Sequence, residues 1–144
     1  MSDIEKAKEL FSTGEYTCVL VKDDKILTST LGGIAPMLGF IKDGVNLSGF
    51  SAADKIVGKA AALLFVLAGV TEVFSSVLSK KAEEILTRHA VEYSCETVTE
   101  SIINRAGTGP CPMENAVAEV DDPREAYDEI NRTLDILRNE KRRI

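Results

Sequence analysis

Apolar and polar residues alternate along this chain with two different periods, one typical of helices and one typical of strands. In "IEKAKELF" the apolar positions recur every three or four residues, and a capping box at Ser2 and Glu5 precedes them. This pattern predicts a helix from Ser2 to about Thr13. The next segment, "YTCVLVKDDKILTST", holds two apolar runs around the pair "DD", which predicts a β-hairpin that ends before a glycine pair.

The middle of the chain predicts two helices in succession. The first lies in "APMLGFIKDG", with proline near its start and glycine past its end. A second capping box, Ser51 with Asp54, indicates a helix that continues through the apolar run Ala60 to Val70. That run is apolar on all sides, which is typical of a helix buried within the protein.

The second half predicts a third strand in "VTEVFSSVLS", a helix in "SKKAEEILTRHA" and a fourth strand in "VEYSC". Thr97 and Glu100 resemble the cap of a short helix that ends near Gly107, and residues 113–120 are expected to be helical. Residues 122–144 form a final amphipathic helix with one apolar stripe. The expected order is α-β-β-α-α-β-α-β followed by two or three helices, in one α/β domain of residues 1–144 with a mixed sheet.

Composition narrows the class of protein. A chain of 144 residues with 44% hydrophobic and 28% charged residues suits one folded domain. Its net charge of −6 excludes the basic surface of a nucleic-acid-binding protein. The longest apolar run is too short to span a bilayer, the N-terminus lacks an apolar signal core, and three cysteines form no disulfide framework. We therefore expect a cytoplasmic protein without a membrane or nucleic-acid partner.

The stretch "GTGPCPMEN", residues 107–115, contains half of the zinc-deaminase motif P-C-x-x-C, with Glu114 in place of the second cysteine. The only histidine, His89, is followed by Glu92 in H-x-x-E spacing, whereas the zinc motif requires H-x-E. His89 is also expected to end a helix rather than begin one. The sequence therefore predicts no metal site and no zinc-dependent deaminase.

The predicted order of hairpin, helix, strand, helix and strand resembles the cytidine deaminase-like fold. The whole chain, above all "ADKIVGKAAALL" with "GTGPCPMEN", resembles a small family of uncharacterised microbial proteins that have this fold without its zinc motif. The resemblance implies three α-β-α layers, a mixed sheet of about four to five strands and an appended C-terminal helix. In the deaminase order the metal ligands would lie at the start of the helices expected at Ser51 and Ser79. No histidine or cysteine is present at either place. The fold transfers; the chemistry does not.

The resemblance would also place two helix N-termini side by side, which is an arrangement that binds anions. Both ends are rich in lysine although the protein is acidic, so we expect a phosphorylated small molecule such as a nucleotide or an ADP-ribose-type ligand, with no cofactor required. The residues expected to bind it are Ser51, Asp54, Lys55, Lys59, Ser79, Lys80, Lys81, Cys111 and Glu114. A structural explanation stays open: surface lysines are common, and capping alone accounts for Asp54.

Cys111 precedes Pro112, so it is expected at the N-cap of a helix, where the dipole favours a thiolate. A rigid structural turn explains the same residues. Three functions follow from these alternatives. The leading one is a domain that binds a phosphorylated small molecule; the second is an enzyme that uses Asp54 or Cys111 as a nucleophile on a nucleoside-type substrate. The third is an assembly protein whose C-terminal helix docks on a partner or on a second copy, as in a homodimer.

Overall fold

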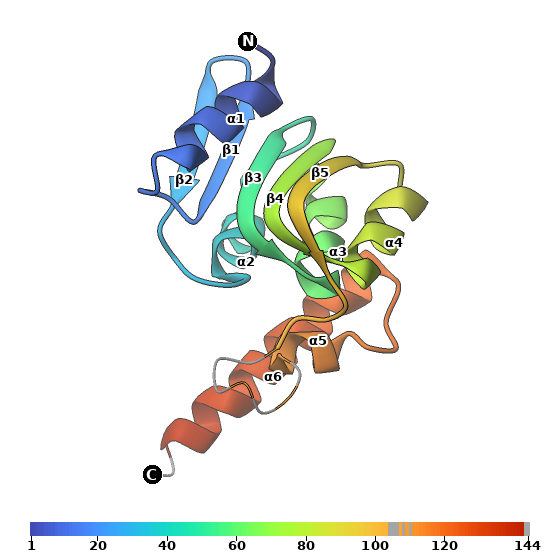
Figure 1. Cartoon of the computed structure of the whole chain (residues 1–144). Helices are drawn as coiled ribbons and strands as arrows, with labels where there is room; N and C mark the ends of the chain where they lie inside the picture. The colour runs from blue at the N-terminus through green and yellow to red at the C-terminus, as the bar shows by residue number, and fades with distance from the viewer. Residues whose placement is uncertain (104–106, 108, 110, 143–144) are drawn as a thin grey trace.

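A mixed β-sheet with helices on both faces organises the chain (Figure 1). The computed structural model describes residues 1–103, 107, 109 and 111–142. The helices are α1 (Asp3–Ser12), α2 (Ala35–Lys42), α3 (Lys59–Ala68), α4 (Lys80–Arg88), α5 (Pro112–Ala116) and α6 (Pro123–Arg142). The strands are β1 (Cys18–Lys22), β2 (Lys25–Ser29), β3 (Ser51–Val57), β4 (Glu72–Ser79) and β5 (Glu92–Thr99).

The sheet has five strands in the order β2-β1-β3-β4-β5. β1 pairs antiparallel with both β2 and β3, while β3, β4 and β5 run parallel. Helices α3 and α4 connect the parallel strands, because such strands cannot be joined by a tight turn. The predicted mixed α/β architecture with a C-terminal helix is confirmed, whereas the cytidine deaminase-like assignment stays a prediction.

Two hydrophobic cores lie on opposite faces of the sheet. The smaller one joins α1 to β1, β3 and β4 through Ala7, Val19, Val21, Ala53 and Phe74. The larger one joins the other face to α2, α3, α4 and α6. Cα–Cβ directions alternate along a strand, so a central strand such as β3 supplies both cores and is buried on both faces.

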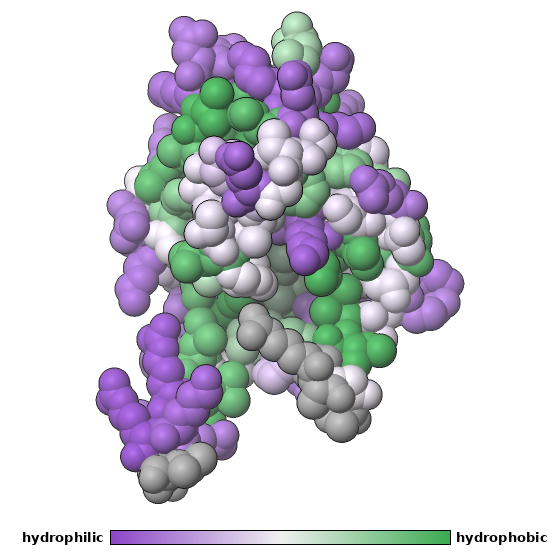
Figure 2. Space-filling model, turned by 60° about the vertical axis from the view of Figure 1, so that its left-hand side comes forward, coloured by the Kyte–Doolittle hydropathy of each residue, from purple (hydrophilic) through white to green (hydrophobic). Residues whose placement is uncertain are grey.

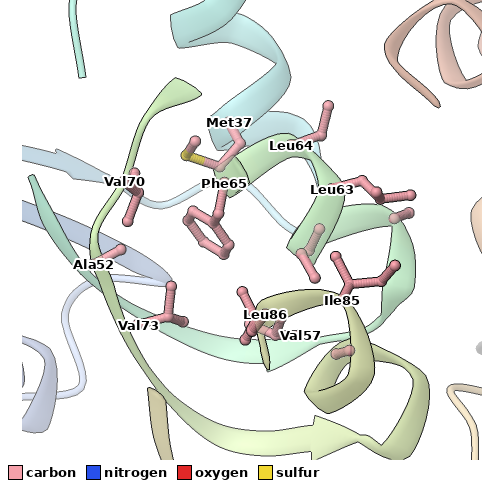
Figure 3. Packing of buried hydrophobic residues seen from close by; sticks show 14 of the residues in the cluster. Met37, Ala52, Val57, Leu63, Leu64, Phe65, Val70, Val73, Ile85 and Leu86 are labelled. Carbon is pink, nitrogen blue, oxygen red and sulfur yellow. The ribbon is translucent and has the colours of Figure 1, made fainter. Parts of the chain in front are cut away.

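Helix α3 lies at the centre of the larger core. Its residues 59 to 65 are all buried, as the all-round apolar pattern predicted. Phe65 points into the core between Met37 of α2 and Val73 of β4 (Figure 3). Burying a side chain of this size stabilises the fold by about 1.5–3 kcal/mol. No helix in the described residues is long and apolar enough to cross a bilayer.

The prediction of a helix that begins at Ser51 is wrong for its first seven residues, because these residues form β3. Ser51 and Asp54 pair with β1 and β4 instead of capping a helix. A strand that is buried on both faces has no polar alternation, so its sequence resembles that of a buried helix. The helix begins only after Gly58, at Lys59.

Two further boundaries differ from prediction. The short helix expected from Thr97 does not start there, because β5 continues to Thr99 through β-branched residues that favour a strand. The rest of that expected helix falls partly on residues 104–106, outside the described residues. The helix expected over residues 113–120 is the shorter α5, which ends at Ala116.

Helix α6 follows the sequence prediction. Ala126 and Ile130 are buried, and Tyr127, Leu134 and Leu137 pack against the larger core. The stripe expected to dock on a partner therefore contacts the protein's own core. Figure 1 shows α6 extending away from the sheet toward the C-terminus, and hydrophilic residues cover its far end in Figure 2.

Candidate functional site

The N-termini of α3 and α4 lie at the same edge of the sheet. β3 and β4 are adjacent and parallel, and the last residues of β3 pair with those of β4, Val57 with Leu78. Each strand leads directly into a helix, at Gly58 and Ser79 respectively. The paired helix N-termini expected at Ser51 and Ser79 are thus found at Gly58 and Ser79, at the carboxyl edge of the parallel strands where α/β folds commonly bind ligands.

The carboxylate of Glu114 lies on the N-terminus of α3. Its Oε1 accepts a hydrogen bond from the backbone N–H of Lys59 at 2.8 Å, and its Oε2 accepts one from Ala60 at 2.9 Å. The first N–H groups of a helix have no partner within the helix, and its dipole attracts negative charge there. An oxyanion supplied by α5 therefore already occupies this end of α3.

Gly58 provides the room for that carboxylate. A Cβ at this position would lie 2.2 Å from Oε1 of Glu114 and 2.8 Å from Cγ1 of Ile102. The φ angle of Gly58 is −102°, which any residue can adopt, so close approach rather than backbone conformation requires glycine here. The group that approaches is the side chain of Glu114.

The side chain of Lys59 binds the segment after α5 to the N-terminus of α3. Its side chain is only 7% exposed, and its Nζ donates to the carbonyl of Ala118 at 3.2 Å and pairs with Asp121 at 3.0 Å. The hydrogen bond from Lys59 lowers the pKa of Asp121. Lys55, in contrast, is exposed and lies on β3, because the helix starts only after it.

The N-terminus of α4 carries the other predicted residues. Ser79 is its N-cap, and the Oγ accepts a hydrogen bond from the N–H of Ala82 at 3.1 Å. Lys80 is exposed and its Nζ lies 2.6 Å from a carboxylate oxygen of Glu100, whose hydrogen bond raises the pKa of Lys80. Lys81 is also exposed. The two lysines predicted at the N-terminus of α4 are therefore both exposed to solvent.

Cys111 occupies the N-cap position of α5 with Pro112 after it, as predicted. Its N–H donates to the carbonyl of Ile102 at 3.0 Å, and its side chain makes no capping hydrogen bond. The helix that follows is a single short turn of five residues, so its dipole is small. The stretch "GTGPCPMEN", residues 107–115, includes residues 108 and 110, which lie outside the described residues.

Asp54 lies in the middle of the sheet, in a row of residues that runs across four strands. The register places Cys18 of β1 opposite Asp54, Asp54 opposite Ser75 of β4, and Ser75 opposite Cys95 of β5. We call these four residues the polar row. Directly opposed residues share one face, and both cysteines belong to the larger core, so the row faces α2, α3 and α4.

Asp54 is 5% exposed, and its carboxyl forms no ion pair among the described residues. Its Oδ1 accepts a hydrogen bond from the N–H of Lys55 at 2.7 Å. Burial raises the pKa of Asp54 to about 7, although this hydrogen bond acts in the opposite direction. Burial, and then the charge of Asp54, also raise the pKa of the Cys18 thiol.

Sequence reasoning missed the neighbours of Asp54. Ser75 is fully buried, and its Oγ donates to the carbonyl of Val77 at 2.5 Å. A buried serine in an otherwise apolar strand is a signal that the segment "EVFSSVL" contains, but only the strand register shows that it faces Asp54 and Cys95.

A metal centre has no ligand set in the described part of the chain, where no three His, Cys, Asp or Glu side chains converge. His89 is the exposed C-cap residue of α4 rather than part of its apolar face, because the chain leaves the core at that point. Among the described residues, the N-terminus of α3 and the polar row are therefore the two features that could bind a ligand or take part in a reaction.

Comparison with known proteins supports the fold and gives a family. A crystal structure of a DUF1893 family protein, TM1506 from Thermotoga maritima, is similar with a TM-score of 0.80 and 26% sequence identity, over 88% of this chain and 86% of that chain. No curated protein matches. The model of the TM1506 family, a domain of unknown function (DUF1893), matches residues 6–134. Because this match spans nearly the whole sequence, the chain belongs to the DUF1893 family.

Proposed function

We propose that this protein binds a small phosphorylated molecule of the nucleotide class, ADP-ribose-type ligands included, at the carboxyl edge of β3, β4 and β5. The observation that carries the proposal is the Glu114 carboxylate on the N–H groups of Lys59 and Ala60. Phosphate oxygens bind helix N-termini through the same backbone donors. Glu114 is then a tethered occupant with which the phosphate of a ligand competes.

The neighbouring end of α4 supports this proposal. Lys80 and Lys81 lie in the first helical turn, where a cation is unfavourable by ~0.3–1 kcal/mol. Both side chains are exposed in a protein whose net charge is −6. Glu100 already pairs with Lys80, so an anion bound between the two helix ends would offset the unfavourable placement of Lys81.

Asp54 provides a second, independent observation, on the strand β3 that leads into α3. It is a nearly buried carboxyl whose described hydrogen-bond donor is only the next backbone N–H. It precedes Gly58 by four residues, which corresponds to roughly 13 Å of extended strand. A ligand that contacts both Asp54 and the helix end must be elongated, as a nucleoside phosphate is.

Calorimetric titration with inorganic phosphate, ADP and ADP-ribose tests the proposal. We expect Glu114→Gln to bind the phosphorylated ligands about tenfold more tightly than wild type, because its neutral amide competes less well for the helix end. The double change Lys80→Ala with Lys81→Ala should weaken binding. Glu119→Gln changes an exposed glutamate nearby and serves as the control. Absence of binding by wild type and by Glu114→Gln at about 1 mM ligand would refute the proposal.

A second candidate function is an enzyme that acts on a nucleoside-type substrate with Asp54. The observation that favours it is the pKa of about 7, since efficient general acid–base groups have a pKa near the working pH. Such a carboxyl suits proton transfer better than nucleophilic attack, which requires the ionised form. Cys111 lacks a comparable feature in the described contacts.

We expect any turnover of nucleosides by the intact protein to depend on pH through one apparent pKa near 7, and to be lost in Asp54→Asn. Chromatography of reaction mixtures between pH 5 and pH 9 measures this. Turnover that persists in Asp54→Asn with an unchanged pH profile would exclude Asp54 as the acid or base.

A further inference from the structure

The outer edge of β5 is the longest unpaired strand edge in the described structure. β5 is last in the strand order, and its one neighbour among the described strands is β4. Its eight residues correspond to roughly 26 Å of extended chain. The N–H and C=O groups on the far side of such a strand form a template for pairing with another chain.

The side chains of this edge are acidic. Glu92 and Glu96 lie on β5 and Glu100 follows it, four residues apart, and all three are exposed. Glu100 pairs with Lys80, whereas Glu92 and Glu96 form no ion pair with any described residue. β5 itself contains no lysine or proline, which commonly protect strand edges, so the charge along this strand is entirely negative.

A shallow, open groove that includes two glutamates begins beside the first residues of β5. It has a volume of about 500 Å³ and is lined by Glu72, Thr87, Ala90, Val91, Glu92 and Tyr93. Glu72 and Glu92 are directly opposed on adjacent strands, so their like charges repel. Burial first, and then this repulsion, raise the pKa of Glu72, against the attraction of Lys8. A cationic side chain in the groove would relieve the repulsion.

We propose that the outer edge of β5 binds an extended, basic segment of a partner protein, which adds to the sheet as a sixth strand. The main chain of that segment pairs with the free edge, and its lysine or arginine side chains contact Glu92 and Glu96. The first of these cations enters the groove beside Tyr93.

A second copy of this chain fits the edge poorly. Antiparallel pairing of two β5 strands centred on Glu96 places Glu96 opposite itself and Glu92 opposite Glu100. Other registers still bring the glutamates of both copies to one seam. Charge complementarity therefore selects a basic partner, and it does so independently of ligand binding at the helix ends.

The test is fluorescence anisotropy of labelled eight-residue peptides titrated with the full chain. One peptide alternates threonine and lysine, and a matched peptide has glutamate for lysine. A third repeats the lysine peptide with N-methyl groups on alternate residues, which removes the donors that pair with a strand edge. Hydrogen exchange of the β5 amides with and without the lysine peptide locates the binding.

We expect the lysine peptide to bind and protect β5, and the N-methylated and glutamate peptides to bind at least about tenfold more weakly. The double change Glu92→Lys with Glu96→Lys should weaken binding to a similar extent. Glu9→Lys with Glu15→Lys makes the same change of charge on exposed residues elsewhere and should have no effect.

Three results would overturn the proposal. Equal binding of the N-methylated peptide would show that charge alone attracts it. No binding of the lysine peptide would show that the edge is closed to strands. A dimer in sedimentation analysis that the lysine peptide dissociates would assign the edge to a second copy.

Discussion

Asp54→Asn is expected to stabilise the folded protein at pH 8, by as much as about 4 kcal/mol. The pKa of Asp54 is about 7 in the folded protein against a value of 3.8 for an exposed aspartate, and each pKa unit corresponds to about 1.4 kcal/mol. Above pH 7 the wild-type protein must hold a buried charge that forms no ion pair with any described residue. Asparagine keeps the shape and the acceptor for the N–H of Lys55 without that charge.

The stability difference between the two proteins depends on pH, because the pKa of Asp54 differs between the folded and unfolded states. Because the folded state raises the pKa, the contribution of Asp54 to stability is complete below about pH 4 and is lost as the pH rises to about 7. The stability of wild type should therefore fall across this window relative to that of Asp54→Asn. The difference between the two proteins becomes constant above pH 7.

Urea unfolding at intervals from pH 4 to pH 8 measures the difference. Asp24→Asn makes the same change in the exposed turn between β1 and β2 and should follow wild type at every pH. Equal stabilities of wild type and Asp54→Asn at pH 8 would mean that the carboxyl is solvated or paired in solution. A confirmed gain would show that the wild-type residue is retained at the expense of stability, as residues of functional sites commonly are.

The second large effect is expected at the start of α3, where Glu114→Ala should destabilise the protein by about 2–3 kcal/mol. The change removes a carboxylate that accepts from the N–H groups of Lys59 and Ala60, and hydrogen bonds to charged groups contribute about 1.5–3 kcal/mol. It also frees α5 from the helix that forms the centre of the core. Urea unfolding measures this effect, with Glu119→Ala as the exposed control.

Gly58→Ala tests the same contact from the other side. Its Cβ would overlap Oε1 of Glu114 at 2.2 Å and approach Ile102 at 2.8 Å, and overpacking of this kind costs typically about 1–3 kcal/mol. In the Glu114→Ala background the more severe overlap is absent, so the cost of the alanine should be smaller. Costs that simply add would show that Glu114 does not lie against Gly58 in solution.

Local signals were sufficient for much of the fold. The capping box at Ser2 and Glu5, the serine before α4 and the apolar stripe of α6 each identify a helix from residues within one or two turns. The hairpin of β1 and β2 is likewise determined by two apolar runs and a short turn. Cys111 at the N-cap of α5 also follows from the proline beside it.

Segment 51–57 shows where local signals fail. Ser51, Asp54 and the alanines between them satisfy the rules for a helix start, and the strand they form is visible only from its partners β1 and β4. Pairing on both edges and burial on both faces outweigh a small difference in intrinsic preference. The error moved the first helix N-terminus from Gly58 to Ser51 and gave Asp54 a capping role that it does not have.

The sequence by itself determined the α/β class and the capped or amphipathic helices α1, α4 and α6, because those properties depend on neighbours along the chain. Only the tertiary structure decided that Glu114 lies on α3, more than fifty residues away, and that Asp54 faces Cys18 and Ser75 inside the sheet. The physical reason is that a pKa or a capping bond depends on burial and on distant partners. Those follow from how the strands pair.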